Sequence, residues 1–136
     1  MSGLTMPKSD EDVLARRGEI AAALRALVPG EGVITAEPEL RPYECDGLTA
    51  YRQLPMLVVL PETAAQVAAV LRYCHAEGVK VVPRGAGTSL SGGALPLADG
   101  VLLGMAKFNR IRAIDFANRV VVAESGVTNL AVTQAV

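Results

Sequence analysis

The chain has 136 residues, of which 51% are apolar and 20% are charged, a balance typical of a single folded globular domain. Its 13 basic and 14 acidic residues almost cancel, so there is no basic field that could hold a nucleic acid backbone. The polar, acidic N-terminus excludes a secretory signal, and no apolar run reaches the ~18–20 residues that a membrane span needs. With only two cysteines, Cys45 and Cys74, the sequence has no disulfide framework or metal cluster and favours a reducing, cytoplasmic compartment.

Residues 1–36 are predicted to be an N-terminal helical segment. Residues 1–9 are expected to fray, and a helix is expected over 10–28, because apolar residues recur there at helical spacing: Ile20, Ala23, Leu24 and Leu27. Ser9 is the expected N-cap, and a break is expected at Gly18.

Residues 37–55 are predicted to be an extended linker that crosses the surface. Three prolines and one glycine interrupt any regular pattern in this stretch. Only a short strand, at 33–35, is expected between the helix and the linker.

Residues 56–82 predict a strand, a helix and a second strand with tight connections. The apolar run 56–60 has strand length, and Thr63 is the expected N-cap of a helix with Gln66 at the reciprocal position. The helix should bury one stripe, which consists of Val67, Val70, Leu71 and Cys74. With a second strand at 79–82, this pattern predicts a right-handed βαβ crossover between parallel strands.

The remaining elements complete an α/β (α+β) fold prediction. A strand is expected at 101–105, and a hairpin is expected from 111–116 and 119–124 around a short turn. Thr128 opens a last helix, which has no C-terminal cap before the sequence ends. We therefore expect the chain to be the N-terminal fragment of a longer protein.

Between the second and third of these strands lies a loop, Arg84–Gly93, with four glycines and three Ser or Thr hydroxyls. It follows the carboxyl end of a strand, the edge of an open α/β sheet where ligands bind. Glycines let a ligand approach the main chain, and successive backbone N–H groups can form an anion-binding nest. The loop therefore predicts a phosphate or pyrophosphate site.

Neither of the two commonest phosphate loops matches. The G-x-G-x-x-G fingerprint fits Gly85 and Gly87, but Leu90 stands at the third position. The Walker A spacing fits Gly87 and Gly92, but Gly93 and Ala94 stand where Lys and Ser or Thr are required. A flexible surface connection remains the alternative on the loop alone.

The stretch PRGAGTSLSGG, with the βαβ unit before it and the strands after it, resembles the pyrophosphate loop of FAD-linked oxidases of the vanillyl-alcohol-oxidase type. The resemblance to this PCMH-type FAD domain covers about residues 16–136, and within the family it is strongest to the FAD-binding subunits of glycolate-oxidising enzymes. It implies that 56–136 are the first, incomplete part of an FAD-binding domain. It also implies FAD-binding roles for Pro83, Arg84, Gly85, Ala86, Gly87, Thr88, Ser89, Gly92 and Gly93.

Some family members attach FAD covalently through a histidine in this loop. Thr88 stands in that place here, so the resemblance implies non-covalent FAD. The Arg84 side chain is either a phosphate partner or an exposed charge.

The implied function is that of an FAD-dependent 2-hydroxy-acid dehydrogenase or oxidase, which converts a small substrate such as glycolate to the 2-oxo acid by hydride transfer to the flavin. D-lactate and D-2-hydroxyglutarate dehydrogenases of the same family remain alternatives, as does a non-catalytic module that binds a phosphate ligand. Catalytic residues are expected beyond Val136, so the fragment itself is expected to be inactive. Further subunits of an oxidase complex are the expected partners, and any membrane association would run through them.

Other polar residues carry no site prediction. His75 is expected on a helix surface, Cys74 in the core, and Cys45 in the irregular segment without a neighbour that would activate its thiol. The stretch from Tyr43 to Tyr51 is read as a packed surface loop, with proximity to the cofactor or a partner as the alternative. The basic residues after the third strand, Lys107, Arg110 and Arg112, are read as solvated charges, with contact to the adenine half of FAD or to a neighbouring chain as the alternative.

Overall fold

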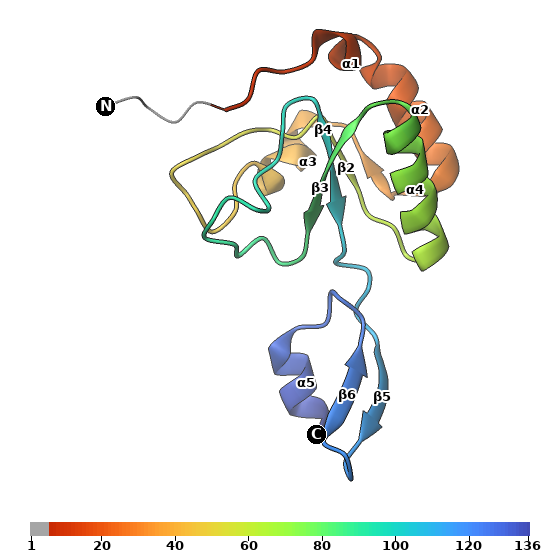
Figure 1. Ribbon diagram of the computed structural model, residues 1–136, viewed down its shortest axis with the longest axis vertical. Helices are drawn as coiled ribbons and strands as arrows, with labels where there is room; N and C mark the ends of the chain where they lie inside the picture. The colour runs from red at the N-terminus through yellow and green to blue at the C-terminus, as the bar shows by residue number, and fades with distance from the viewer. Residues whose placement is uncertain (1–5) are drawn as a thin grey trace.

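The computed structural model describes residues 6–136, so the predicted fraying of the first five residues lies outside the described part (Figure 1). A four-stranded sheet with helices forms the larger part, and a two-stranded hairpin with one helix forms a smaller part beyond it. The elements in chain order are α1 Glu11–Ala15, α2 Arg17–Leu27, β1 Val33–Ile34, α3 Glu37–Leu40, the 3-10 turn η1 Arg41–Tyr43, β2 Leu57–Val59, α4 Ala64–Ala76, β3 Lys80–Arg84, β4 Gly100–Gly104, β5 Ile111–Asp115, β6 Val120–Ala123 and α5 Asn129–Ala135. The predicted α/β class is confirmed.

The N-terminal helical segment is present, but its cap and its break differ from the prediction. Asp10, not Ser9, caps α1, because its carboxylate accepts hydrogen bonds from the N–H groups of Asp12 and Val13. The break lies at Arg16 rather than at Gly18. Arg16 donates to the side chain and the carbonyl of Glu77, at 2.7 and 3.0 Å, and so fastens the break to the end of α4.

The segment 37–55 is less extended than its prolines predicted. Pro38 lies in the first turn of α3 and Pro42 in that of η1, positions where the missing N–H has no helical partner to lose. Leu40 is buried, and Tyr43 and Leu54 pack beside it against the sheet. This segment therefore covers one face of the sheet.

The sheet has the strand order β1-β2-β4-β3, in which β2, β4 and β3 are parallel and β1 is antiparallel to β2. The predicted crossover from β2 through α4 to β3 is present between parallel strands. The later strand β4, however, inserts between β2 and β3 and pairs with both of them. Its five residues are all buried, as a central strand covered on both faces requires.

Alternate side chains of the sheet face two different layers. Leu57, Val59, Val101 and Leu103 face α2 and α4, where they join Ile20, Leu24, Val70 and Cys74 in the main core. Val58, Val82 and Leu102 face the opposite layer, which contains Leu40. Because successive side chains of a strand point to opposite faces of the sheet, the segment 37–55 covers one face and the helices α2 and α4 cover the other.

Helix α4 begins as the sequence predicted and buries a narrower stripe. The Thr63 hydroxyl accepts the N–H of Gln66 at 3.2 Å, and the Gln66 side chain accepts the N–H of Glu62 at 2.7 Å. Leu71, predicted to be in the stripe, is 45% exposed, since the sheet contacts the helix along Val70 and Cys74. Burial raises the pKa of the Cys74 thiol to about 11, which keeps it protonated and unreactive.

The predicted hairpin is confirmed as β5 and β6, and with α5 it forms a separate unit below the main sheet in Figure 1. The Asp115 carboxylate accepts from the N–H and the side-chain amide of Asn118, at 2.9 and 2.7 Å, which fixes the turn. Arg119 then takes the left-handed conformation, with φ of 54°.

The three basic residues read as solvated charges are in ion pairs. Lys107 contacts Glu62 at 2.7 Å, and both Arg110 and Arg112 contact Glu124, whose side chain is 6% exposed. Hydrogen bonds from Arg110, with help from Arg112, lower the pKa of Glu124 to about 2. The contacts of Arg110 and Arg112 with Glu124 join the two sides of the hairpin at its open end.

This ion cluster makes the hairpin sensitive to acid. A carboxylate with a lowered pKa in the folded state stabilises that state above its unfolded pKa of roughly 4.3, and the contribution is lost as the pH falls toward about 2. We expect the backbone NMR shifts of β5 and β6 to move between these pH values in the wild type. In Glu124→Gln the shifts of residues 110–112 and 122–124 should move much less, whereas those next to Asp115, whose pKa is lowered by its hydrogen bonds from Asn118, should still move. An identical acid response of residues 110–112 and 122–124 in both proteins would contradict this origin.

Candidate functional site

The glycine-rich loop begins where β3 ends, at the carboxyl edge of the parallel strands. Pro83 and Arg84 are the last residues of β3, and the loop runs from there to the buried Ala94. Gly87 and Gly92 have φ values of 73° and 75°, a region that a side chain makes costly. The left-handed backbone conformation at these two positions therefore favours glycine.

The main chain of this loop presents a row of donors without acceptors. Within the described part of the chain, none of the backbone N–H groups of residues 85–90 donates a hydrogen bond. The Ser89 hydroxyl accepts from the N–H groups of Ser91 and Gly93, both at 3.3 Å, and holds the second half of the loop in shape. Consecutive free N–H groups in such a turn form an anion nest.

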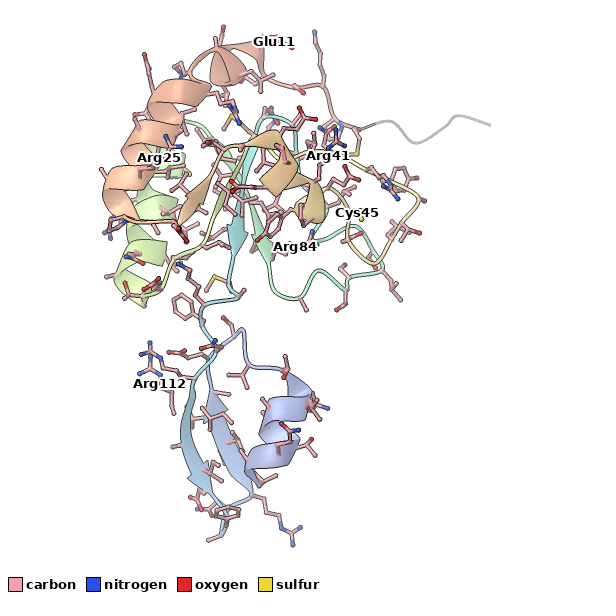
Figure 2. All side chains as sticks on the ribbon, turned by 180° about the vertical axis from the view of Figure 1, so that it is seen from behind. Glu11, Arg25, Arg41, Cys45, Arg84 and Arg112 are labelled. Atoms are coloured by element: carbon pink, nitrogen blue, oxygen red, sulfur yellow. The ribbon has the colours of Figure 1, made fainter. Side chains whose placement is uncertain are left out.

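The Arg84 side chain is not an exposed charge, which was one of the two alternatives that the sequence left open. It is half-buried, and its Nη1 donates to the carbonyls of Cys45, Tyr43 and Ala94, at 2.8, 3.3 and 3.4 Å. The guanidinium also lies 5.7 Å from the centre of the Tyr43 ring. Figure 2 shows Arg84 beside the segment that carries Cys45.

Gly87 is confined by this arginine as well as by its φ angle. A Cβ atom on Gly87 would collide with the guanidinium of Arg84, with 2.6 Å to Nε. The loop thus folds over the side chain of Arg84, its first residue. The main chain at Gly87 can approach the guanidinium closely because glycine has no side chain.

Gly47, which the sequence reading did not single out, packs against the same loop. A Cβ atom there would lie 2.7 Å from the carbonyl oxygen of Thr88 and 2.8 Å from that of Ser89. Its neighbour Asp46 is 4% exposed. The sequence signal was the Asp-Gly pair inside a polar, aromatic stretch, but nothing in the spacing connects it to a loop about 40 residues later.

A second stretch, residues 125–128, meets the start of the glycine loop across a cavity of about 270 Å³. The cavity is lined by Gly85, Ala86, Ala106, Ser125, Gly126, Val127 and Thr128. Sequence reasoning used Ser125 and Gly126 only as a strand break, although Ser-Gly-Val-Thr has the same small, hydroxyl-rich composition as the loop. The fold therefore brings two such stretches to one place.

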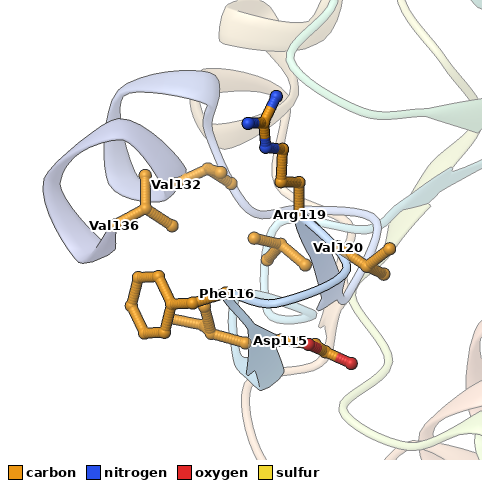
Figure 3. Close-up of a pocket in the computed structure, with 8 residues that line it drawn as sticks. Asp115, Phe116, Arg119, Val120, Val132 and Val136 are labelled. Atoms are coloured by element: carbon orange, nitrogen blue, oxygen red, sulfur yellow. The ribbon is translucent and has the colours of Figure 1, made fainter.

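Other candidates lie outside this site. The cavity between the hairpin turn and α5, about 260 Å³, has mostly apolar lining with Asp115 and Arg119 among its residues (Figure 3). His75 is exposed on α4, as predicted. Within residues 6–136, no helix is both long and apolar enough to cross a bilayer.

Residues 55–136 match the model of a family described as an FAD binding domain, which is more than half of the chain. The chain belongs to this FAD-binding domain family. The match confirms the predicted FAD-binding domain.

Curated relatives are similar over most of this chain. Glycolate oxidase subunit GlcD of Escherichia coli K12 is 53% identical over 120 residues, which are 88% of this chain and 24% of that protein. Mitochondrial D-2-hydroxyglutarate dehydrogenase of Bos taurus is 36% identical over 113 residues, or 83% of this chain and 21% of that protein. The chain thus spans about a quarter of the length of these relatives.

Two solved structures share the fold at low sequence identity. 4-ethylphenol oxidase from Gulosibacter chungangensis superposes with a TM-score of 0.80 at 22% identity, over 96% of this chain and 26% of that one. p-Cresol methylhydroxylase superposes with a TM-score of 0.79 at 23% identity, over 97% of this chain and 26% of that one. At these identities the likeness shows the fold alone.

The residues present fit the pyrophosphate of FAD. An anionic group of that size needs several N–H donors close together and no bulky side chain between them and the ligand. The free N–H groups of residues 85–90 and the left-handed Gly87 and Gly92 provide this, and the small residues 125–128 lie across the same cavity.

The packing of residues 125–128 requires a glycine at position 126, and this requirement can be tested by measuring stability. A Cβ atom there would collide with the carbonyl oxygen of Met105 and lie 2.7 Å from that of Phe108, and both are main-chain atoms. We expect Gly126→Ala to lower the free energy of unfolding by about 1–3 kcal/mol, as overpacking does, in urea denaturation.

The matched control is Gly85→Ala. A Cβ atom at Gly85 would have no neighbour within 4 Å, and its φ is not left-handed. Its stability should stay within about 0.5 kcal/mol of the wild type. Equal stability of the two variants would show that the 125–128 stretch is not packed as described.

Proposed function

We propose that this chain is the first part of the FAD-binding domain of a flavin-dependent 2-hydroxy-acid dehydrogenase or oxidase that converts glycolate to glyoxylate. The row of free N–H donors at residues 85–90 is the observation that carries the proposal. The substrate class is supported by the 53% identity to a protein named as a glycolate oxidase subunit. We assign residues 56–136 to this domain, 37–55 to a linker and 1–36 to a helical segment that precedes it.

The proposed pyrophosphate site is the loop itself. The site is built from Pro83, Arg84, Gly85, Ala86, Gly87, Thr88, Ser89, Gly92 and Gly93, and the main-chain N–H groups of residues 85–89 are the donors that contact the phosphates. Thr88 has no group that could form a stable bond to the flavin ring, so we propose that FAD is held without a covalent link. Ser125 and Thr128 extend the site across the cavity.

Bound FAD would supply the redox chemistry, by accepting a hydride from the substrate carbon that carries the hydroxyl. The residues of this chain would bind and orient the cofactor. Within residues 6–136, the single histidine, His75, is exposed on α4 and is not among the residues that line the cavity beside the loop. We therefore propose that a base for the substrate hydroxyl comes from outside this chain and that the 136 residues alone are inactive.

Two alternatives differ in their consequences. D-lactate or D-2-hydroxyglutarate could be the substrate, since relatives with these names are 32% and 36% identical. A non-catalytic module that binds another phosphate ligand would use the same donors. We favour the flavoenzyme and place it in the cytoplasm. We propose that it works with other subunits of an oxidase complex, because the relative at 53% identity is named as a subunit. Any membrane association would run through those subunits.

The direct test is a visible spectrum of the full-length natural protein that carries this sequence. We expect flavin absorbance in the purified protein, and we expect acid precipitation to leave the flavin in solution because no covalent bond holds it. A protein that stays colourless after incubation with FAD would overturn the proposal. Preferential binding of ATP with Mg²⁺ would favour the phosphate module instead.

Substrate choice can be read from the same flavin band under anaerobic conditions. We expect glycolate to bleach the band faster than D-lactate or D-2-hydroxyglutarate at equal concentration. Faster bleaching by either of the other acids would replace the glycolate assignment and keep the 2-hydroxy-acid class. Bleaching by none of the three would overturn the class.

A further inference from the structure

The glycine loop is backed by a segment about 40 residues earlier in the chain. We call Tyr43–Leu48 the backing segment, because its main chain lies against the loop from Arg84 to Gly92. It begins at the last residue of η1, in the layer that covers the sheet. The backing segment contributes main-chain atoms to these contacts, the carbonyls of Tyr43 and Cys45 and the bare Cα of Gly47, so its position and the loop's position determine each other.

Arg84 joins the two segments. A single nitrogen, Nη1, is within hydrogen-bond distance of two carbonyls of the backing segment, those of Tyr43 and Cys45, and of the carbonyl of Ala94 at the far end of the loop. A charged donor strengthens such bonds to about twice those of a neutral one. Arg84 thus closes the base of the loop while its guanidinium occupies the space under Gly87.

The turn at Asp46–Leu48 completes the contact. Asp46 Oδ1 accepts the N–H of Leu48 at 2.9 Å, which sets the turn and points the bare Cα of Gly47 at the carbonyls of Thr88 and Ser89. Asp46 Oδ2 is buried, and within the described residues it has no hydrogen-bond partner. A buried acceptor without a donor is unfavourable.

We propose that Arg84 and Gly47 are positioning residues, which hold the 85–90 main chain in its anion-binding shape without contacting the phosphates. This inference rests on the proposed FAD site. Donors that are fixed before the ligand arrives bind it more tightly, because less ordering remains to be done on binding. FAD affinity then depends partly on Arg84 and Gly47, which lie on the side of the loop away from the ligand. The positive charge of Arg84 serves the carbonyls of Tyr43, Cys45 and Ala94 and not the phosphates.

The first test is Gly47→Ala in the full-length protein, with FAD affinity measured by flavin fluorescence. The added methyl group would press on the carbonyls of Thr88 and Ser89, 2.7 and 2.8 Å away, and displace the donors between them. We expect FAD binding roughly tenfold weaker. We also expect the backbone NMR shifts of residues 85–90 to change in the FAD-free protein, a readout independent of the cofactor.

Gly18→Ala is the matched control, since a Cβ atom at Gly18 has no neighbour within 4 Å. It should leave both readouts unchanged. If Gly47→Ala leaves both the FAD affinity and the backbone shifts of residues 85–90 unchanged while the wild type binds FAD, the inference is wrong and the proposed function stands. If the wild type itself binds no FAD, the proposed function fails first.

The second test separates positioning by Arg84 from a direct phosphate contact. Lysine replaces arginine well as a point charge near a phosphate, but it lacks the planar guanidinium that lies by the Tyr43 ring and fills the space next to Gly87. We expect Arg84→Lys and Arg84→Gln to weaken FAD binding to a similar extent, again roughly tenfold. The factor should be the same at low and high salt, because the affected contacts lie inside the protein.

A phosphate contact gives the opposite pattern. Arg84→Lys would then retain most of the affinity, and the difference between Arg84→Gln and the wild type would shrink as salt screens the charge. Either result would overturn the positioning role. Urea denaturation of both variants checks that they are folded, and a folded Arg84→Lys protein alone is enough to decide the question.

Discussion

The hydrogen bonds from the Arg84 guanidinium to three main-chain carbonyls tie together the parts of this protein that matter for its site. They connect the end of β3, the backing segment and the close of the glycine loop, which are separated by 10 to 41 positions in the chain. A glycine-rich loop without such a tie would lose much backbone freedom on binding a ligand. With the tie, the free N–H groups of residues 85–90 are held in place by the fold, which is the rigidity that the proposed phosphate site requires.

The sheet explains why this tie can form. Alternate residues of β2, β4 and β3 face two layers, and one of those layers is the segment 37–55 that leads into the site. The buried strand β4 carries the chain past the carboxyl edge and on to the hairpin, so that residues 125–128 return to the same edge. Parallel pairing thus places two small, hydroxyl-rich stretches on either side of one cavity, a geometry that suits a cofactor with an extended phosphate group.

The comparison of sequence and structure is most informative where the two differ. Local signals were sufficient for the cap at Thr63, the hairpin turn and the parallel crossover, since each depends on residues a few positions apart. They failed for Leu71, whose helical spacing was right but whose side of the helix receives no neighbour. They also failed for the basic residues near the hairpin, because Glu124 lies 12 and 14 positions from its two arginines and meets them only through strand pairing.

The sequence by itself determined the class of fold, the place of the glycine loop and the family, because helix and strand periods, turn residues and a specific motif are all local properties. Only the tertiary structure decided what Arg84 contacts, why Gly47 and Gly126 lack side chains, and that 125–128 faces the loop. These features depend on contacts between main-chain atoms far apart in the chain. Such contacts leave no pattern in spacing or hydrophobicity, because every residue carries a backbone carbonyl and a glycine in the sequence does not reveal which distant residue it contacts.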